Sequence, residues 1–377
     1  MKTYKIITLG ASGAGKTVFL SSMFKALSIQ GYYTFFLEID DQVKRKQLNA
    51  IYTQIISGDT WPQGTKYSDI SEWTFDCCVK VPNTLETYSA CRFTYLDYAG
   101  GRLTDSGEDA EFESVVQQAN TFLGLLDGQK IYSLLKGNND LAADAFLKKD
   151  LPSIVKWMHK CRVPIHFVIS KWDLIEDNFS LKQVRECLLE ISVFEELIRD
   201  RNRANSPVRL IPVSSVGSGF TILQFDGSMR KISGVVPRPF QVEVPLASVL
   251  PDGLKARFYE LKEKQEGVEK TGEKKLNIFS IVLQILGRAA QITLAVIAPE
   301  FAVDPYLMQK LINTIGIGLK KDERVSLKRA QKLKKENDSS LKLVKDEETA
   351  LMHAVNNFAI IQNKLERDFP DSELILT

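Results

Sequence analysis

The segment GASGAGKT near the start of the chain has the residue types and spacing of a loop that binds phosphate. Gly10, Gly15, Lys16 and Thr17 complete the pattern GxxxxGK followed by Ser or Thr, and Gly13 is an additional glycine. Small residues let backbone N–H groups surround phosphate oxygens, and the start of a following helix adds partial positive charge. We therefore expect Lys16 to contact the β- and γ-phosphates of a nucleotide and Thr17 to ligate Mg²⁺.

The elements on either side of this loop suit the same role. The apolar run of residues 4–9 predicts a buried strand, and residues 16–31 carry apolar side chains at helical spacing. An ordinary glycine-rich turn would not require this strand, loop and helix order. The nucleotide-binding residues predicted here are Gly10, Ser12, Gly13, Ala14, Gly15, Lys16, Thr17 and Val18, and Lys16 is also predicted to be catalytic.

A second pattern, Asp-x-x-Gly, begins at Asp97, where the strand-like run CRFTYLD ends, and is completed by Gly100. A carboxylate at a strand end can hold magnesium, usually through water, and a glycine N–H can meet the γ-phosphate. The pattern also occurs in simple turns, but here it follows a predicted antiparallel pair of strands. It predicts Asp97 as a metal ligand and Gly100 as part of the catalytic site.

A third pattern, SKWD, follows the apolar run VPIHFVI and contains Ser170, Lys171 and Asp173. A carboxylate here can accept hydrogen bonds from N1–H and the exocyclic amine of guanine, whereas adenine presents an acceptor at N1 and no amine at C2. The aliphatic part of Lys171 would lie along the base. The alternative is a surface Lys-Trp-Asp turn. A weaker fourth piece, VSS and the following valine, predicts Ser214, Ser215 and Val216 near the guanine O6.

With these four patterns in order, residues 2–250 resemble the TRAFAC class of P-loop GTPases, which comprises Ras-like and translation-factor-related proteins. The segments WPQGT and PRPFQVEVPL are similar to the bacterial families called double-GTPase domains. The resemblance implies GTP or GDP with Mg²⁺ as cofactors. It also implies that Thr65 is the switch threonine, whose hydroxyl closes on Mg²⁺ and whose N–H contacts the γ-phosphate, with a structural turn as the alternative.

Two departures from the family pattern concern base binding and hydrolysis. Ser170 replaces the usual Asn or Thr and loses the reach of an amide toward the base and the phosphate loop. Gly101 stands where small Ras-like GTPases place the glutamine that orients the attacking water. Arg102, next to it, is a candidate for stabilising charge in the transition state. We therefore expect slow intrinsic hydrolysis or hydrolysis assisted by a partner.

Strand-like and helix-like segments alternate over most of the chain, which predicts an α/β fold with a doubly wound, mostly parallel sheet containing one antiparallel strand. The composition changes near Leu250, where strand signals become scarce. We therefore expect a GTPase domain over residues 1–250 and a helical extension over residues 251–377, whose last helix runs from about Asp346 to Phe369. Within the first domain we expect one helix capped by Asp40 or Asp41 and ending at Gly58, and another over residues 181–201.

The composition restricts the class of protein. At 377 residues and 44% apolar content, the chain can bury a sizeable core. A formal net charge of +2 argues against a protein that binds nucleic acid over its whole surface. The five cysteines have no CxxC spacing, which indicates reduced structural thiols. His166, within an apolar run, is expected to be a core histidine with a hydrogen-bond partner. The N-terminus has no secretory-signal pattern, and we expect a cytoplasmic location.

The C-terminal region combines apolar and basic segments. Residues 276–299 are long and apolar enough to suggest a membrane span, but polar residues recur on one side of the expected helix, which makes it amphipathic. Residues 255–345 contain 19 Lys and Arg against 11 Asp and Glu. Such helices could bind a protein partner, a second copy of the chain or an anionic membrane on its inner face.

The sequence therefore predicts a molecular switch that binds GTP and Mg²⁺ and has weak or assisted GTPase activity, with the helical extension responding to the nucleotide. Three alternatives stay open: an ATP-dependent P-loop NTPase, a scaffold that holds its nucleotide without turnover, and a GTPase that associates with or remodels membranes. An ATP-driven transporter is disfavoured because no LSGGQ-like signature is present and Tyr98, rather than an acidic residue, follows Asp97.

Overall fold

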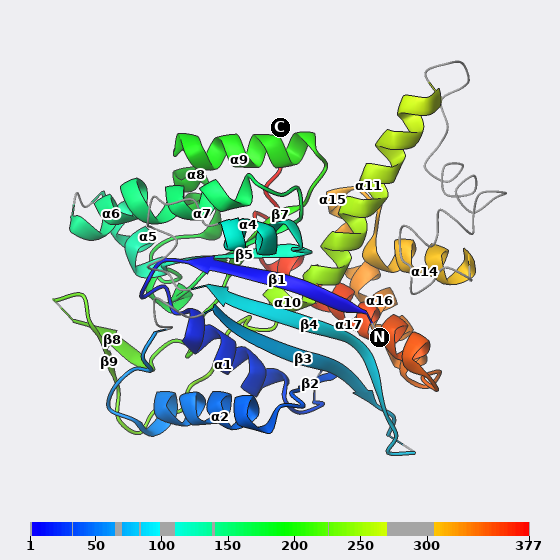
Figure 1. The fold of residues 1–377 in the computed structure, drawn as a ribbon, viewed down its shortest axis with the longest axis horizontal. Helices are drawn as coiled ribbons and strands as arrows, with labels where there is room; N and C mark the ends of the chain where they lie inside the picture. The colour runs from blue at the N-terminus through cyan, green and yellow to red at the C-terminus, as the bar shows by residue number, and fades with distance from the viewer. Residues whose placement is uncertain are drawn as a thin grey trace.

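The computed structural model describes residues 2–31, 33–64, 70–82, 84–98, 110–137, 140–224, 226–269 and 305–376. Within these ranges, seven strands form one sheet in the order β2-β3-β4-β1-β5-β6-β7 (Figure 1). Their bounds are β1 Thr3–Gly10, β2 Phe36–Glu38, β3 Ile70–Lys80, β4 Thr87–Tyr98, β5 Thr121–Leu126, β6 Ile165–Ile169 and β7 Val208–Pro212. The β2–β3 and β3–β4 pairings are antiparallel and the other pairings are parallel, so β3 alone runs against the rest. The predicted α/β class and mostly parallel sheet are confirmed.

Helices cover both faces of the sheet because alternate side chains of the buried strands point to opposite sides. Ile6 belongs to one apolar cluster, whereas Ile7 and Leu9 belong to the other. The first cluster includes side chains of α1 (Lys16–Leu27), α10 (Val244–Ala247), α11 (Val249–Glu269), α14 (Pro305–Ile315) and α17 (Glu347–Asp368). The second includes side chains of α4 (Ala110–Gln117), α5 (Gly128–Leu135), α7 (Leu151–Met158), α8 (Leu181–Leu189) and α9 (Ser192–Arg203).

Local signals account for several helix boundaries. The side chain of Asp41 accepts hydrogen bonds from the backbone N–H groups of Val43 and Lys44 and caps α2 (Gln42–Ser57), as predicted. Asp346 caps α17 in the same way. The segment expected to form one helix over residues 181–201 instead forms α8 and α9, because Ile191 has extended backbone angles and interrupts the helix.

Further elements lie between and after these. They are α6 Leu141–Ala145, a π-helix Phe146–Asp150, a 3₁₀-helix Trp172–Leu174, a hairpin of β8 Thr221–Leu223 and β9 Met229–Lys231, α15 Lys321–Arg324 and α16 Leu327–Leu341. The hairpin lies near the end of the sheet where β1 finishes (Figure 1). The helices α14, α16 and α17 lie toward the end where β1 starts.

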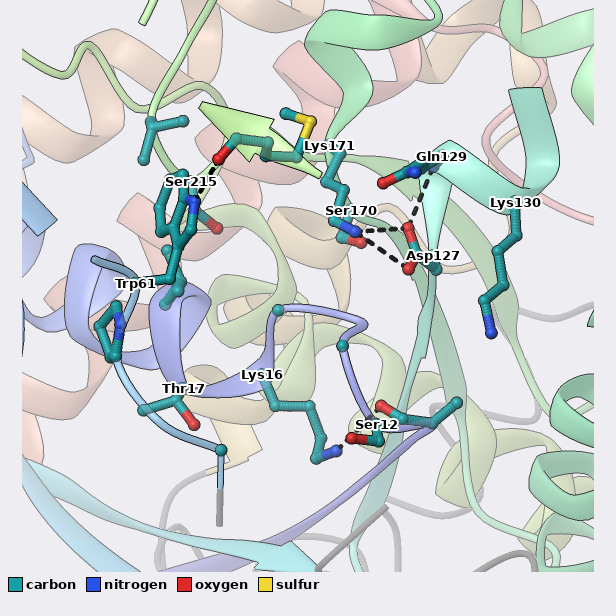
Figure 2. A pocket seen from close by; sticks show the side chains of 18 of the residues that line it. Ser12, Lys16, Thr17, Trp61, Asp127, Gln129, Lys130, Ser170, Lys171 and Ser215 are labelled. Carbon is teal, nitrogen blue, oxygen red and sulfur yellow. Dashed lines mark hydrogen bonds and ion pairs between the residues drawn. The ribbon is translucent and has the colours of Figure 1, made fainter. Parts of the chain in front are cut away.

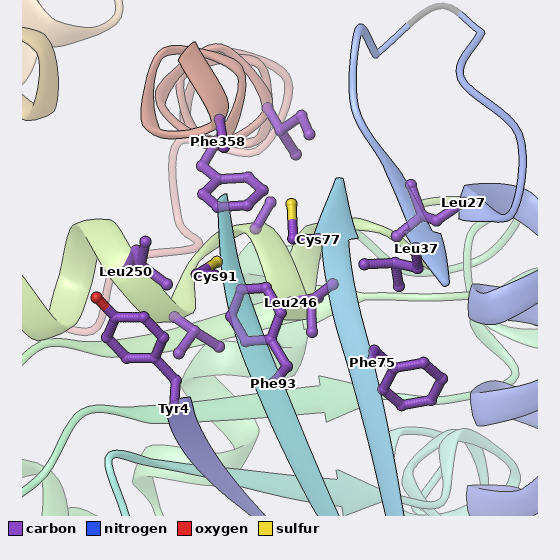
Figure 3. Close-up of a cluster of buried hydrophobic side chains, with 14 of the residues drawn as sticks. Tyr4, Leu27, Leu37, Phe75, Cys77, Cys91, Phe93, Leu246, Leu250 and Phe358 are labelled. Atoms are coloured by element: carbon purple, nitrogen blue, oxygen red, sulfur yellow. The ribbon is translucent and has the colours of Figure 1, made fainter. Parts of the chain in front are cut away.

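The described part of the C-terminal region packs directly on the sheet. Phe358 of α17 reaches the strands from above (Figure 3), with its ring centroid 5.1 Å from Phe35 and 6.1 Å from Phe93. The last residues extend along β7, where Leu210 N–H donates to the Ser372 carbonyl at 2.7 Å and Leu374 N–H donates to the Val208 carbonyl at 2.9 Å. The helix α11 begins at Val249, close to the residue where the composition changes, and the division into two domains stays a prediction.

Buried charged side chains also join this region to the sheet. Asp252 of α11 accepts from Arg209 Nε at 2.6 Å and from His166 Nε2 at 2.9 Å, so the predicted core histidine does have a partner. Burial by itself raises the pKa of Asp252, but the Arg209 charge and the His166 hydrogen bond outweigh it and hold that pKa well below its usual range. Arg209 also donates to Glu366 of α17 at 2.9 Å.

The basic and apolar segments of the C-terminal region are described only in part. Residues 276–299, expected to form an amphipathic helix, lie outside the described residues. On α16, the side chains of Lys328, Lys332, Lys334 and Lys335 are exposed, in agreement with a solvated basic face. No helix within the described ranges combines the length and the apolar character that a membrane crossing requires.

Candidate nucleotide-binding site

A cavity of about 700 Å³ lies at the carboxyl ends of β1, β5, β6 and β7. The helix after β1 packs on one face of the sheet and the helix after β5 packs on the other, so the loops diverge here and leave a crevice. The cavity is lined by parts of the loops after these four strands, by the segment Trp61–Gly64 and by the β8–β9 hairpin. It brings three of the four predicted motifs together (Figure 2).

The predicted phosphate loop forms one end of the cavity. Gly13 and Gly15 have φ angles of +82° and +89°, a left-handed conformation in which a side chain would be strained. Ser12, Gly13, Gly15, Lys16, Thr17 and Val18 line the cavity. Gly10 and Ala14 lie behind this surface, Gly10 at the end of β1 and Ala14 in the apolar core. The loop conformation therefore depends on the glycines that the motif specifies.

Lys16 is the most buried polar side chain of the loop, with 8% of its surface exposed. Its Nζ donates to the Gly10 carbonyl at 2.7 Å and to the Ala11 carbonyl at 3.4 Å. Burial lowers the pKa of Lys16, and the nearby Asp97 charge partly opposes that shift. The amine is thus held by neutral carbonyl acceptors, and negatively charged oxygens such as those of a phosphate would pair with it more strongly.

The predicted magnesium ligands lie on adjacent strands and the first turn of α1. Asp97 is 3% exposed at the end of β4, level with Thr8 of β1, and Thr17 is half-buried in the cavity wall. Asp97 itself does not line the cavity. A carboxylate and a hydroxyl are oxygen donors of the kind that Mg²⁺ prefers. The donor set therefore fits Mg²⁺, with the carboxylate acting through water. Thr65, Gly100, Gly101 and Arg102 lie outside the described residues.

The opposite end of the cavity contains the predicted base-reading group. Asp173 Oδ1 accepts a hydrogen bond from Ser214 Oγ at 2.5 Å, and Ser214 Oγ accepts from Gly217 N–H at 2.8 Å. Burial raises the pKa of Asp173, although the Ser214 hydrogen bond opposes that shift. Ser215 and Val216 line the cavity beside them. The SKWD and VSS motifs, which come from different strands, thus form one polar recess.

Ser170 and Lys171 have partners that the sequence did not suggest. Ser170 Oγ donates to the Leu126 carbonyl of β5 at 3.1 Å, so its hydroxyl is used inside the sheet. Lys171 has a left-handed φ of +52°. Its Nζ lies 2.8 Å from Asp127 Oδ1 (Figure 2). Asp127 ends an apolar strand as Asp97 does, and this shared position is the signal that could have identified it.

The segment before Thr65 and the β8–β9 hairpin form another wall that sequence reasoning largely missed. Trp61 Nε1 donates to the Met229 carbonyl at 2.6 Å, and its ring packs edge-on against Phe220. Lys231 Nζ lies 4.8 Å from the Trp61 ring centroid. Short strands of three residues carry too little alternation to be found in a sequence. Trp61 is therefore held in place by contacts with a hairpin that lies far from it in the sequence.

No model of a known protein family matches the chain, and a comparison with curated proteins found no significant match. The resemblance to P-loop GTPases therefore stays a prediction, carried by the motifs and by the geometry of this cavity.

Proposed function

We propose that the protein binds GTP with Mg²⁺, hydrolyses it slowly or with the help of a partner, and acts as a molecular switch. The observation that carries this proposal is that Lys16 and Asp173, which belong to motifs far apart in the chain, line the same cavity. One end of that cavity suits phosphates and the other suits a base with two neighbouring donors. A glycine-rich turn and an unrelated surface turn would have no reason to meet in this way.

At the phosphate end, the backbone N–H groups of residues 13–17 and the start of α1 supply donors and partial positive charge. Lys16 would exchange the Gly10 carbonyl for oxygens of the β- and γ-phosphates. Thr17 and, through water, Asp97 would hold Mg²⁺, which neutralises negative charge on the phosphates when bound. The catalytic assignments of Thr65, Gly100 and Arg102 are part of this proposal.

At the base end, Asp173 would accept the N1–H and the amine of guanine. Ser214 orients the carboxylate. Because the carboxylate is partly buried, a ligand atom that can only accept hydrogen bonds would face its negative charge with little water between them. Adenine, which presents an acceptor at N1, would meet that repulsion. The fit of the site to guanine therefore follows from one carboxylate and its surroundings.

A switch also needs an element that responds to the nucleotide. The segment that contains Trp61 precedes Thr65 and is attached to the β8–β9 hairpin, so a contact between Thr65 and a γ-phosphate would also act on this wall of the cavity. The C-terminal helices are the proposed contact for a protein partner, a second copy or an anionic membrane surface.

Titration of the purified protein with labelled GTP, GDP and ATP in the presence of Mg²⁺ tests the nucleotide. We expect GTP and GDP to bind and ATP to compete poorly. Asp173→Asn is expected to shift preference from GTP to xanthosine triphosphate, because an amide can donate to the carbonyl that replaces the amine. Asp200→Asn is the matched control, since Asp200 is an exposed residue of α9. Preference for ATP, or a variant that still prefers GTP, would refute the base assignment.

Turnover is tested separately by phosphate release over many cycles. We expect slow release that Lys16→Met abolishes. A protein that binds GTP but releases no phosphate, even with cell extract added as a source of partners, would be a nucleotide-bound scaffold rather than a GTPase.

A further inference from the structure

The loop after β5, Asp127–Gln129, contacts both neighbouring walls of the cavity. Asp127 Oδ1 lies 2.8 Å from Lys171 Nζ, and Asp127 Oδ2 accepts from the same amine at 3.0 Å. Gln129 Nε2 donates to the Gly227 carbonyl of the β8–β9 turn at 2.8 Å. These three residues follow β5, which lies in the sheet between β1, the strand before the predicted phosphate loop, and β6, the strand before the predicted base loop. Figure 2 shows Asp127 and Gln129 close to Ser170 and Lys171 of the predicted base loop.

Groups of the protein itself hold Asp127 in place. Its side chain caps α5 by accepting from Gln129 N–H at 3.0 Å, and the residue is only 7% exposed. A cation close to a carboxylate that is buried to this degree stabilises its charge, and Lys171 is a cation that Asp127 contacts. The position of the Lys171 amine is therefore set by a rigid helix start.

Gly128 brings the two loops into direct backbone contact. A Cβ atom added at Gly128 would lie 2.0 Å from the Ser170 carbonyl oxygen, a distance at which the backbone must move. The loop after β5 and the loop after β6 therefore pack without an intervening side chain. A shift in one would move the other, and with it Lys171 and Asp173.

The Ser170 hydroxyl donates to the Leu126 carbonyl, so its one donor hydrogen is used inside the sheet and does not face the cavity. Lys171 also has left-handed backbone angles, which an L-residue adopts only when its surroundings hold it there. Some other group must fix the direction of the lysine stem across the cavity. The Asp127 carboxylate is the group in contact with that stem's charged end.

We propose that Asp127 is the positioning residue of the base end, fixing Lys171 so that its stem covers one face of a guanine ring beside Asp173. This inference rests on the proposed function, since it concerns the same cavity. Gln129 extends the same support to the hairpin, and so to Trp61 on another wall. Asp127 acts through Lys171 and leaves the phosphate loop unaffected.

The test compares two probes with the full-length protein: GDP, which occupies both ends of the cavity, and inorganic tripolyphosphate, which occupies the phosphate end alone. Asp127→Asn keeps the shape of the side chain and removes its charge. We expect it to weaken GDP binding about tenfold, the scale of one lost charge-assisted hydrogen bond, and to leave tripolyphosphate binding unchanged. Lys171→Met should do the same, and Asp200→Asn should change neither.

The double variant distinguishes a pair acting together from two separate effects. If Asp127 acts through Lys171, Asp127→Asn combined with Lys171→Met will bind GDP about as well as either single variant. Losses that multiply, equal losses for GDP and tripolyphosphate, or unchanged GDP binding would each overturn the inference. Wild-type protein that binds tripolyphosphate but not GDP would instead refute the proposed function, and the inference with it. Asp127→Glu provides a second variant, expected to recover part of the GDP affinity.

Discussion

Two aspartate–cation pairs lie toward opposite ends of the same parallel strands and differ in their access to solvent. Arg209 and Asp252 are 2.6 Å apart, and each side chain is 1% exposed. Lys171 and Asp127 are 2.8 Å apart, with 22% and 8% of their side chains exposed. The distances are similar, but the first pair is enclosed by α11 and α17, whereas the second faces the cavity.

The two regions also differ in how many hydrogen-bond partners the protein supplies to each charged side chain. Asp252 accepts from Arg209, from His166 and, at 3.0 Å, from Gln362 Nε2. In the cavity, Lys16 donates to two backbone carbonyls, and the half-buried Asp173 accepts from the Ser214 hydroxyl. The enclosed charged side chains stabilise the attachment of the C-terminal helices. The charged side chains of the cavity can exchange their partners for a ligand.

The largest loss of stability is expected when the enclosed Arg209–Asp252 pair is broken. Asp252→Ala would leave the buried Arg209 and His166 without their shared acceptor, and we expect the free energy of unfolding to fall by about 3–5 kcal/mol. Urea denaturation followed by circular dichroism measures this. Asp200→Ala removes an exposed partner of Arg203 and should cost less than about 1 kcal/mol. Equal losses of unfolding free energy for the two variants would contradict the distinction between enclosed and solvent-exposed ion pairs.

Apolar contacts at the same end of the sheet test whether α17 belongs to the core. Phe358 is fully buried against Phe35 and Phe93, so Phe358→Ala is expected to lower the free energy of unfolding by about 3 kcal/mol or more. A single, shifted unfolding transition in urea would show that α17 and the sheet unfold together. Two transitions, with the second at the wild-type midpoint, would show that they unfold separately.

A cavity charge should affect binding more than stability. Lys16→Met removes a buried amine whose pKa is lowered by burial, which means that the folded state disfavours its charge. We expect the free energy of unfolding to change by less than about 1 kcal/mol or to rise, while GDP affinity falls by about 1.5–3 kcal/mol through loss of charge-assisted hydrogen bonds. Calorimetric titration and urea denaturation on the same samples measure both. A loss of stability as large as that of Asp252→Ala would contradict the comparison.

The two ends should also respond to acid at different pH values. Since the pKa of Asp252 is lowered in the folded protein, its stabilising effect is present above the ordinary aspartate pKa of about 3.9 and is lost as the pH falls below it. The pKa of Asp173 is raised, and the proposed contact with guanine requires its ionised form, so we expect GDP affinity to begin to fall at a higher pH, by at most about tenfold per pH unit.

Titrations of GDP and tripolyphosphate over the same pH range separate this effect from protonation of the phosphates themselves. The ratio of the two affinities should fall on acidification while circular dichroism still shows folded protein. Asp173→Asn should make that ratio independent of pH. A constant ratio in the wild-type protein would mean that Asp173 does not contact the base.

Several parts of the fold could be predicted because their causes are local. The cap at Asp41 depends on a side chain and the backbone two or three residues later, and β5 and β6 are short apolar runs with turn residues around them. The β8–β9 hairpin was missed because three residues per strand give no periodicity. The break at Ile191 was missed because both helices continue the same apolar pattern.

The sequence by itself determined the conformation of the glycine-rich loop after β1, since positive φ angles at Gly13 and Gly15 and the helix start after them are properties of neighbouring residues. It also identified Asp97 and Asp173 as polar groups at strand ends. Only the tertiary structure decided which of these groups meet: Ser214 with Asp173, Lys171 with Asp127, and Arg209 with Asp252. Those pairings depend on the order of strands in the sheet. That order is set by the burial of apolar surface between residues far apart in the chain, so no motif of fixed spacing encodes it.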